Sequence, residues 1–244
     1  MDYRVEVVRP MNTLHLLPNG LGTKDIRPWL APEAVEAMGH CSRFIAESAP
    51  AALRMLSALG LVQEGVRPEI FLLNEHTDAR DLVDLSRWFR TDGDIGLVSD
   101  AGCPGIADPG AHAVRMAHHA GWAVVPHVGP SSIVLALMAS GLNGQSFAFK
   151  GYLPRDPGRR DKLWREMLEG LNRRRETQIF MEPPYRNAQA FGECLSRLPG
   201  DTALCVAVDL TLPDALVVTR SIEEWRELPA PSLQKRPCLF LVGH

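Results

Sequence analysis

Short runs of β-branched and leucine residues alternate with amphipathic stretches along most of the chain, and this alternation constrains the fold more than any other feature. Each run suits one buried strand, and each amphipathic stretch has the apolar period of a helix. Strands that alternate with helices indicate an α/β protein with mostly parallel sheet. In the first half the expected strands are Leu14–Leu17, Arg43–Ile45, Glu69–Leu73, Ile95–Ser99 and Ala123–Pro126, and the expected helices are Pro32–His40, Ala49–Leu59, Asp78–Arg90 and Gly110–Ala120.

The second half has more strand relative to helix, which favours a mixed sheet. Its expected helices are Ser132–Ser140 and Arg159–Leu171, and its expected strands are Phe147–Lys150, Gln178–Met181, Leu204–Val208, Ala215–Thr219 and Cys238–Val242. The change in pattern predicts a domain boundary near Pro126–Pro130, between an N-terminal α/β domain of residues 1–127 and a C-terminal α/β domain of residues 128–244. Since no long flexible linker separates them, we expect the two domains to share a cleft.

The composition indicates a buried core of substantial size and limits the partners of the protein. Hydrophobic residues make up 45% of the 244 positions, and the net charge is −3, so a basic surface patch would have to be local. The five cysteines are scattered and never form Cys-x-x-Cys, so we expect neither a disulfide framework nor a metal site. Met1–Asn12 lacks the apolar core of a signal peptide, and no run of about 18 apolar residues occurs. We therefore expect a cytoplasmic protein with no membrane span.

The segment Ile95–Gly110 leaves a predicted strand, turns through several glycines and prolines, and enters a predicted helix. Asp108 fits the helix N-cap, and Pro109 fits its first position. A glycine-rich loop at the carboxyl end of a parallel strand lets a ligand approach the main chain, although an ordinary strand-to-helix connection has a similar composition. The glycine patterns that bind dinucleotides and nucleoside triphosphates are absent from the sequence, so a pyrophosphate cradle is not expected.

Several ordered motifs give the chain a resemblance to a known family. They are Leu97-Val-Ser-Asp-Ala-Gly-Cys-Pro-Gly-Ile-Ala-Asp-Pro-Gly110, Val125-Pro-His-Val-Gly-Pro130, Ser140-Gly-Leu142, Phe149-Lys-Gly-Tyr-Leu-Pro154, Gly158-Arg-Arg-Asp161 and Phe180-Met-Glu-Pro-Pro-Tyr-Arg186. Together they resemble the tetrapyrrole-methylase superfamily, and in particular its bacterial branch that methylates the ribose 2′-O of a cytidine in small-subunit ribosomal RNA. The resemblance covers roughly Leu14 to Gly243.

The resemblance implies two α/β domains with S-adenosylmethionine bound in the cleft between them, largely by main-chain groups. It also implies a homodimer. Carried over to this sequence, the cofactor-binding positions are Leu17, Pro18, Gly102, Cys103, Pro104, Ile106, Ser131, Ser132, Met181, Ala207 and Pro237. Ser131 and Ser132 begin a predicted helix, where their hydroxyl and N–H groups suit a carboxylate, although simple capping of the helix explains them equally well. Cys103 is expected to make a main-chain contact, since no histidine at a defined spacing would activate its thiol.

Methyl transfer to a ribose hydroxyl also needs a group that accepts a proton. Four residues near the expected cleft are candidates, namely Glu47, His76, Asp100 and Glu182, and each could equally be a cap or a surface residue. Arg159 and Arg160 belong to a basic cluster that could contact RNA phosphates or form a solvated helix face.

Three departures from the RNA-methylating pattern leave the methyl acceptor open. The first loop reads Leu17-Pro-Asn-Gly-Leu-Gly22, Glu47 is followed by Ser48-Ala-Pro50, and Val208–Leu212 lacks the basic residues of the family. The chain also stops at His244 without the helical tail common in that branch. We expect an RNA methyltransferase. The alternatives are a methyltransferase for a tetrapyrrole or another small acceptor, and a catalytically silent paralogue that binds the cofactor or RNA.

Overall fold

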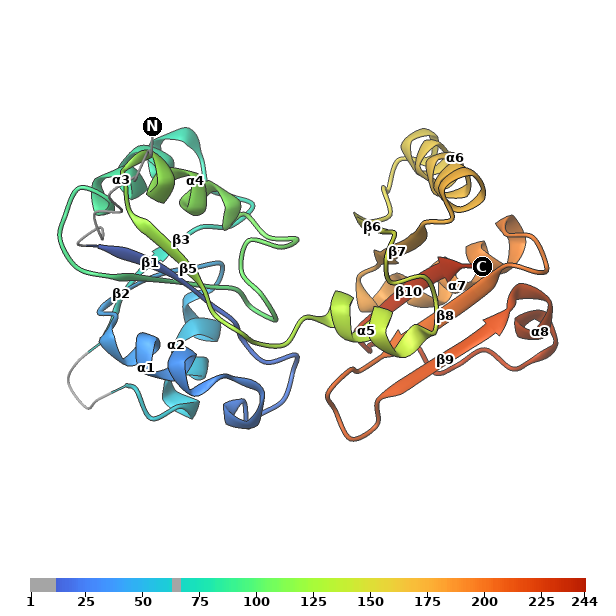
Figure 1. Cartoon of the computed structure of the whole chain (residues 1–244), viewed down its shortest axis with the longest axis horizontal. Helices are drawn as coiled ribbons and strands as arrows, with labels where there is room; N and C mark the ends of the chain where they lie inside the picture. The colour runs from blue at the N-terminus through green and yellow to red at the C-terminus, as the bar shows by residue number, and fades with distance from the viewer. Residues whose placement is uncertain (1–11, 63–66) are drawn as a thin grey trace, which may run out of the picture. The chain divides into compact units, whose positions relative to one another are not determined.

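The structure is a computed structural model that describes residues 12–62 and 67–244. The chain divides into two compact units, Met1–Pro130 and Ser131–His244 (Figure 1). Each unit has its own sheet and its own hydrophobic core, so each is described by itself.

The N-terminal unit is built on a five-stranded sheet with the order β3-β2-β4-β1-β5, in which every described pair is parallel. This confirms the parallel sheet predicted from the alternation of strands and helices. Its elements are β1 (Thr13–Leu17), η1 (Arg27–Trp29), α1 (Pro32–His40), β2 (Arg43–Ala46), α2 (Ala49–Ala58), β3 (Glu69–Leu72), α3 (Ala79–Trp88), β4 (Ile95–Val98), α4 (Ala111–His119) and β5 (Ala123–Pro126).

Helices cover both faces of this sheet, with α1 and α2 on one face and α3 and α4 on the other (Figure 1). Successive residues of one strand therefore face different helices. On β2, Phe44 packs in the core with α1 and α2, whereas Ile45 packs in the core with α3 and α4. Full burial of a side chain of this size stabilises the fold by about 1.5–3 kcal/mol relative to exposure.

The order of the strands creates a switch point between the neighbours β1 and β4. From β1 the chain crosses to β2 on one side, and from β4 it crosses to β5 on the other side. Right-handed crossovers in opposite directions place their helices on opposite faces, so the two loops diverge at the carboxyl ends of these strands. Open α/β sheets bind their ligands at such a point.

The C-terminal unit has a mixed five-stranded sheet with the order β6-β7-β10-β8-β9. Only β6 and β7 are parallel, and the other described pairs are antiparallel. Its elements are α5 (Ser132–Ser140), β6 (Phe147–Tyr152), α6 (Pro157–Arg174), β7 (Thr177–Met181), η2 (Pro184–Arg186), α7 (Asn187–Arg197), β8 (Ala203–Val208), β9 (Leu216–Ser221), α8 (Ile222–Glu227) and β10 (Cys238–Gly243).

The two faces of the mixed sheet belong to different clusters of buried side chains. Ala136 and Leu137 of α5 pack on one face, and α6, α7 and α8 pack on the other. On the second face the rings of Trp164 and Phe180 pack edge to face, with 5.7 Å between their centroids. Within residues 12–62 and 67–244, no helix has both the length and the apolar character that a bilayer span requires.

Candidate functional site

The loops that follow β1 and β4 are joined at the switch point by Asn19, which is only 8% exposed. Its main chain pairs with that of Gly102, with N···O distances of 2.9 and 3.1 Å. Its side-chain amide donates to the carbonyl oxygens of Ser99 and Asp100, both at 3.1 Å, and its Oδ1 accepts the N–H of Gly20 at 2.8 Å. Asn19 therefore fixes the glycine-proline loop. The sequence comparison had marked this position only as a departure from the family pattern.

Replacing Asn19 with alanine should loosen both loops. Three side-chain hydrogen bonds disappear and the Ser99 carbonyl stays buried, so we expect the free energy of unfolding to fall by about 2–3 kcal/mol. Urea denaturation measures this change. Asn172, which is exposed on α6, is the control, and its alanine variant should unfold like the wild-type protein. Equal stability of the two variants would mean that Asn19 does not hold the loops together.

The glycine-proline loop ends differently from the sequence prediction. We predicted Asp108 as the N-cap of the helix and Pro109 as its first residue, but α4 begins at Ala111 and Gly110 is its N-cap. The Asp108 carboxylate instead accepts the N–H of Gly105 at 2.9 Å and that of Gly110 at 2.7 Å. Asp108 thus closes the loop on itself, and this bond network displaces the start of the helix.

Gly102 and Cys103 are held against the end of the loop that follows β5. Gly102 has a φ of +73°, and a Cβ added there would lie 3.4 Å from Leu21 and 3.5 Å from the Pro130 carbonyl oxygen. The Cys103 thiol donates to that same carbonyl at 3.5 Å, and burial raises the pKa of this thiol. A thiol with a raised pKa is a poor nucleophile, which agrees with a structural role for Cys103.

The loop after β5 also touches the loop after β1. A Cβ added at Gly129 would lie 2.2 Å from Cγ and 2.4 Å from Cβ of Pro18, distances that real structures do not allow. Glycine is therefore required at position 129 for the two loops to pack together. The three loops after β1, β4 and β5 form one assembly at the carboxyl edge of the sheet.

The predicted cofactor-binding residues differ in how much surface they offer. Those that are buried are Leu17, Pro18, Gly102, Pro104 and Ala207. Those that are half-buried or exposed are Cys103, Ile106, Ser131, Ser132, Met181 and Pro237. Leu17 and Ala207 have no exposed surface and belong to the hydrophobic cores. Neither offers exposed surface in this structure, so for both residues the contact with a cofactor stays a prediction.

In the C-terminal unit, Ser131 caps α5, because its hydroxyl accepts the N–H of Val134 at 3.5 Å.

A residue that the sequence did not single out follows β8. Thr211 has a φ of +75°, which is rare for a β-branched residue, and its buried hydroxyl has no partner within the described part of the chain. Such strain accumulates at functional sites. Its signal in the sequence was the departure from the family pattern at Val208–Leu212.

An acidic hollow of about 610 Å³ lies beside the glycine-proline loop in the N-terminal unit. It brings together Glu47, His76 and Asp100, three of the four proton acceptors proposed from the sequence. They follow β2, β3 and β4, neighbouring strands of a parallel sheet, and so meet at one edge. Asp108 and Glu75 also line the hollow. The described residues contain no group of three or more His, Cys, Asp and Glu side chains placed to hold a metal ion.

Glu47 is the carboxylate in this hollow that is best placed to exchange a proton. Its Oε1 accepts the N–H of Asp100 at 3.2 Å, and its carbonyl oxygen accepts from Asn74 Nδ2 at 3.3 Å, so side chain and main chain are both fixed. Burial raises the pKa of Glu47. The hydrogen bond from Asp100 opposes the rise, and the carboxylates of Asp108 and Asp100 add to it. A carboxylate with a raised pKa is a stronger base.

Glu182, the fourth proposed proton acceptor, has a different environment. Its Oε1 is held by Arg160 Nη1 at 3.0 Å and by Arg186 Nη2 at 2.9 Å inside the C-terminal unit. Burial raises the pKa of Glu182, and the two guanidinium groups offset part of that rise. A carboxylate that is enclosed between two cations is an ion-pair partner and not a general base, which corrects the prediction.

The same network excludes one of the two roles that the sequence left open for Arg160. This side chain is 6% exposed and also binds Glu193 through its Nε at 2.7 Å, so it does not belong to a solvated helix face. Arg159, one position earlier, is exposed and has no ion-pair partner within the described part of the chain. The helical period explains the difference, because neighbouring positions on α6 point about 100° apart.

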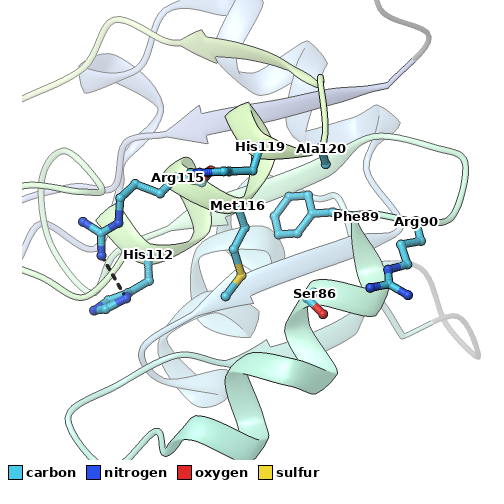
Figure 2. Close-up of a pocket in the computed structure, with 8 residues that line it drawn as sticks. All are labelled: Ser86, Phe89, Arg90, His112, Arg115, Met116, His119 and Ala120. Carbon is cyan, nitrogen blue, oxygen red and sulfur yellow. Dashed lines mark hydrogen bonds between the residues drawn. The ribbon is translucent and has the colours of Figure 1, made fainter.

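A separate hollow of about 540 Å³ lies between α3 and α4 (Figure 2). Phe89 and Met116 lie in its middle, with His112 and Arg115 on one side and Arg90 on the other (Figure 2). Arg115 Nη2 is 3.0 Å from His112 Nδ1. Its lining includes no residue that the sequence predicted for the cofactor or for catalysis, so this hollow is distinct from the candidate site.

Comparisons with known proteins agree with the resemblance seen in the sequence. No family model matches the chain. A ribosomal RNA small subunit methyltransferase I from Vibrio cholerae is 37% identical over 62% of this chain, and the chain spans about half (51%) of that relative's length. A protein of the same name from Bacillus subtilis is 31% identical over 82% of this chain and 64% of its own length. Another from Pseudomonas aeruginosa is 27% identical over 95% of this chain and 78% of its own length.

Two solved structures share the fold. The methyltransferase CobJ superposes with a TM-score of 0.64 at 14% identity and covers 96% of this chain and 94% of its own. The uroporphyrin-III-C-methyltransferase from Thermus thermophilus has a TM-score of 0.52 at 18% identity and covers 95% of this chain and 91% of its own. The chain therefore has the fold of the tetrapyrrole methyltransferases and is a sequence relative of the ribosomal RNA small subunit methyltransferases I.

Proposed function

We propose that the chain is an S-adenosylmethionine-dependent methyltransferase that acts on the ribose 2′-O of a nucleotide in small-subunit ribosomal RNA. The observation that carries the proposal is the assembly of three loops at the switch point, beside a hollow that contains the fixed carboxylate of Glu47. The names of the sequence relatives support the class of substrate.

The residues present fit the methyl donor chemically. Ile106 and Val128 lie on the loops after β4 and β5, and they are 52% and 78% exposed, so their apolar surface is available to an adenine ring. The carboxylates of the neighbouring hollow favour a sulfonium cation. Within the N-terminal unit we propose that the main chain of Gly102–Ile106 holds the cofactor. By resemblance, Ser132, Met181 and Pro237 contribute from the C-terminal unit.

When bound, S-adenosylmethionine supplies an electrophilic methyl group. The protein must then align the acceptor hydroxyl, exclude water and remove one proton. We assign the removal of the proton to Glu47, because its pKa is raised and the Asp100 N–H orients its side chain. Asp100 contributes this contact through its main chain, and His76 is an exposed residue of the same hollow.

Replacing Glu47 with glutamine should lower the rate of methyl transfer about 100-fold and leave the affinity for S-adenosylmethionine nearly unchanged. In the wild-type protein the rate should rise with pH through the raised pKa of Glu47, because only the ionised carboxylate accepts a proton. The variant should lose this limb of the profile. Single-turnover transfer of a labelled methyl group, followed across pH, measures both effects. A Glu47→Gln profile that still matches the wild-type profile would place the base elsewhere.

The function itself is tested in two stages. Calorimetry first measures whether the purified protein binds S-adenosylmethionine, and absence of binding would end the proposal. Mass spectrometry then compares nucleosides of ribosomal RNA from cells with and without the protein, and a missing 2′-O-methylated nucleoside is the expected result. Methyl transfer to a porphyrinoid but not to RNA would select a small acceptor. Binding of the cofactor without any transfer would indicate a silent paralogue.

We further propose a homodimer that works in the cytoplasm, both from the family resemblance. Sedimentation of the purified protein measures the mass of the assembly, and cell fractionation measures its location. A monomer across the micromolar range would remove the first of these two expectations.

A further inference from the structure

A hollow of about 660 Å³ lies in the C-terminal unit, between the start of α6 and the segment formed by η2 and α7. Four arginines line it, namely Arg155, Arg160, Arg186 and Arg197, and we call it the arginine pocket. All of its lining residues belong to one unit. The structure therefore defines it independently of the loops that are proposed to hold the methyl donor.

The charges in and behind the arginine pocket do not cancel. Arg160 and Arg186 share the buried Glu182, Arg160 also binds Glu193, and Arg197 Nη2 binds Asp161 at 2.8 Å. Four guanidinium groups thus face three carboxylates, which leaves one positive charge unbalanced. That charge is associated with Arg155, whose side chain contacts the Tyr185 hydroxyl at 3.2 Å and has no carboxylate partner within the described residues.

The guanidinium group of Arg160 is fixed before any ligand arrives. Arg160 is only 6% exposed, and its contacts with Glu182 and Glu193 fix the orientation of the guanidinium plane. Its Nη2 is enclosed and has no acceptor within the part of the chain that the structure describes. An enclosed donor without a partner is unfavourable, and an incoming oxygen acceptor relieves it. A pre-organised cation also loses little side-chain entropy when it binds an anion.

The start of α7 adds a second feature that favours an anion. This helix of 11 residues begins at Asn187, and no side chain caps its N-terminus. The first N–H groups of a helix lack partners within the helix and carry partial positive charge. Gln189, in the first turn, lines the arginine pocket, so the helix start faces the same hollow. Phosphate groups bind at such termini.

Tyr185 gives the arginine pocket an aromatic rim. Its ring is 67% exposed, and the contact with Arg155 holds its hydroxyl end. An exposed tyrosine beside a phosphate site is the arrangement with which proteins bind unpaired nucleotides, since the ring stacks on a base and the arginine contacts the backbone. A free inorganic anion would make no use of the ring. The chemistry therefore points to a phosphodiester that carries an unstacked base.

We propose that the arginine pocket binds one backbone phosphate of the RNA substrate and that Tyr185 stacks on an adjacent base. The inference rests on the proposed function and deepens it, because it names the surface by which the C-terminal unit holds the RNA. Of the two arginines that the sequence predicted to contact RNA, Arg160 lines this pocket and Arg159 does not.

The test measures the affinity of the full chain for a single-stranded fragment of small-subunit ribosomal RNA over a range of salt concentrations. Arg155→Ala should weaken binding about tenfold and reduce the slope of log affinity against log salt by about 0.7, the value for one phosphate of a single strand. Arg165→Ala is the matched control, because Arg165 is exposed on α6, carries the same charge and does not line the pocket. It should leave the slope unchanged.

Two variants of Tyr185 test the rim. Tyr185→Ala should weaken binding about tenfold, whereas Tyr185→Phe keeps the ring and should stay within about twofold of the wild-type protein. Equal affinities for the Arg155 and Arg165 variants would overturn the phosphate assignment. A loss caused instead by Arg115→Ala, in the hollow of Figure 2, would place the RNA on the N-terminal unit and overturn it as well.

Calorimetry with S-adenosylmethionine on the same samples distinguishes failure of the proposed function from failure of the arginine pocket as the RNA contact. If the wild-type protein binds neither the cofactor nor RNA, the proposed function fails. If the wild-type protein binds both and Arg155→Ala behaves like Arg165→Ala, the proposed function stands and the arginine pocket is not the RNA contact. All of these side chains are exposed, so the variants should keep the wild-type melting temperature.

Discussion

Replacing Arg160 with methionine should lower the free energy of unfolding by about 3–5 kcal/mol, the cost of leaving a buried charge without its partner. Methionine keeps most of the stem of the side chain and removes the guanidinium group. Glu182 would then keep only Arg186, and Glu193 would lose its contact at 2.7 Å. Denaturation in urea, followed by tryptophan fluorescence, measures the loss.

The neighbouring residue provides the control for this experiment. Arg159→Met removes the same charge from the exposed side of α6 and should change stability by less than about 0.5 kcal/mol. A further variant that combines Arg160→Met with Glu193→Gln should recover part of the loss, because the carboxylate that lost its contact at 2.7 Å is gone. If Arg160→Met were as stable as Arg159→Met, Arg160 would be a surface residue, which is one of the two alternatives that the sequence left open.

Replacing Gly129 with alanine should weaken the affinity for S-adenosylmethionine at least tenfold, or by about 1.4 kcal/mol. The new methyl group would overlap the ring of Pro18, which cannot rotate away as a flexible side chain can. The loop after β5 must therefore move off the loop after β1. Both loops belong to the assembly at the carboxyl edge of the sheet, so the main chain that is proposed to hold the cofactor is displaced. Isothermal calorimetry measures the change in affinity.

Gly144→Ala is the control, because a Cβ at that position meets nothing within 4 Å and the residue is not in the left-handed region. Its affinity for S-adenosylmethionine should equal that of the wild-type protein. A Gly129→Ala protein that binds the cofactor as tightly as Gly144→Ala would show that the packing of these two loops does not shape the cofactor site.

Most strands and helices could be predicted from the sequence because their apolar period is strong. The helices Pro32–His40 and Ser132–Ser140 and the strand Ala123–Pro126 have the predicted bounds. Two helices were missed. In α7, Gly192 and Cys194 weaken the helical signal. For α8 a signal was present, since Ser221 and Glu224 form a capping box, which the sequence shows as serine followed three residues later by glutamate.

The candidate site could be predicted only in part, because a motif indicates which loop is used but not which atoms meet. Glu47, His76 and Asp100 meet in one hollow, as their places after neighbouring strands allow. Glu182 and Arg160 were assigned to the site and to the RNA surface, yet they bind each other. They are 22 positions apart, and a pairing over that distance depends on the packing of α6 against β7, which the local sequence pattern does not specify.

The position of β10 has a consequence for synthesis of the protein. This strand comes last in sequence order, yet it lies between β7 and β8 in the middle of its sheet. While the chain emerges from the ribosome, β7 and β8 therefore have no shared neighbour until Cys238–Gly243 has been translated. The N-terminal sheet is complete once β5 has been made, so nascent chains should acquire protease resistance in two stages, and the second stage should require Cys238–Gly243.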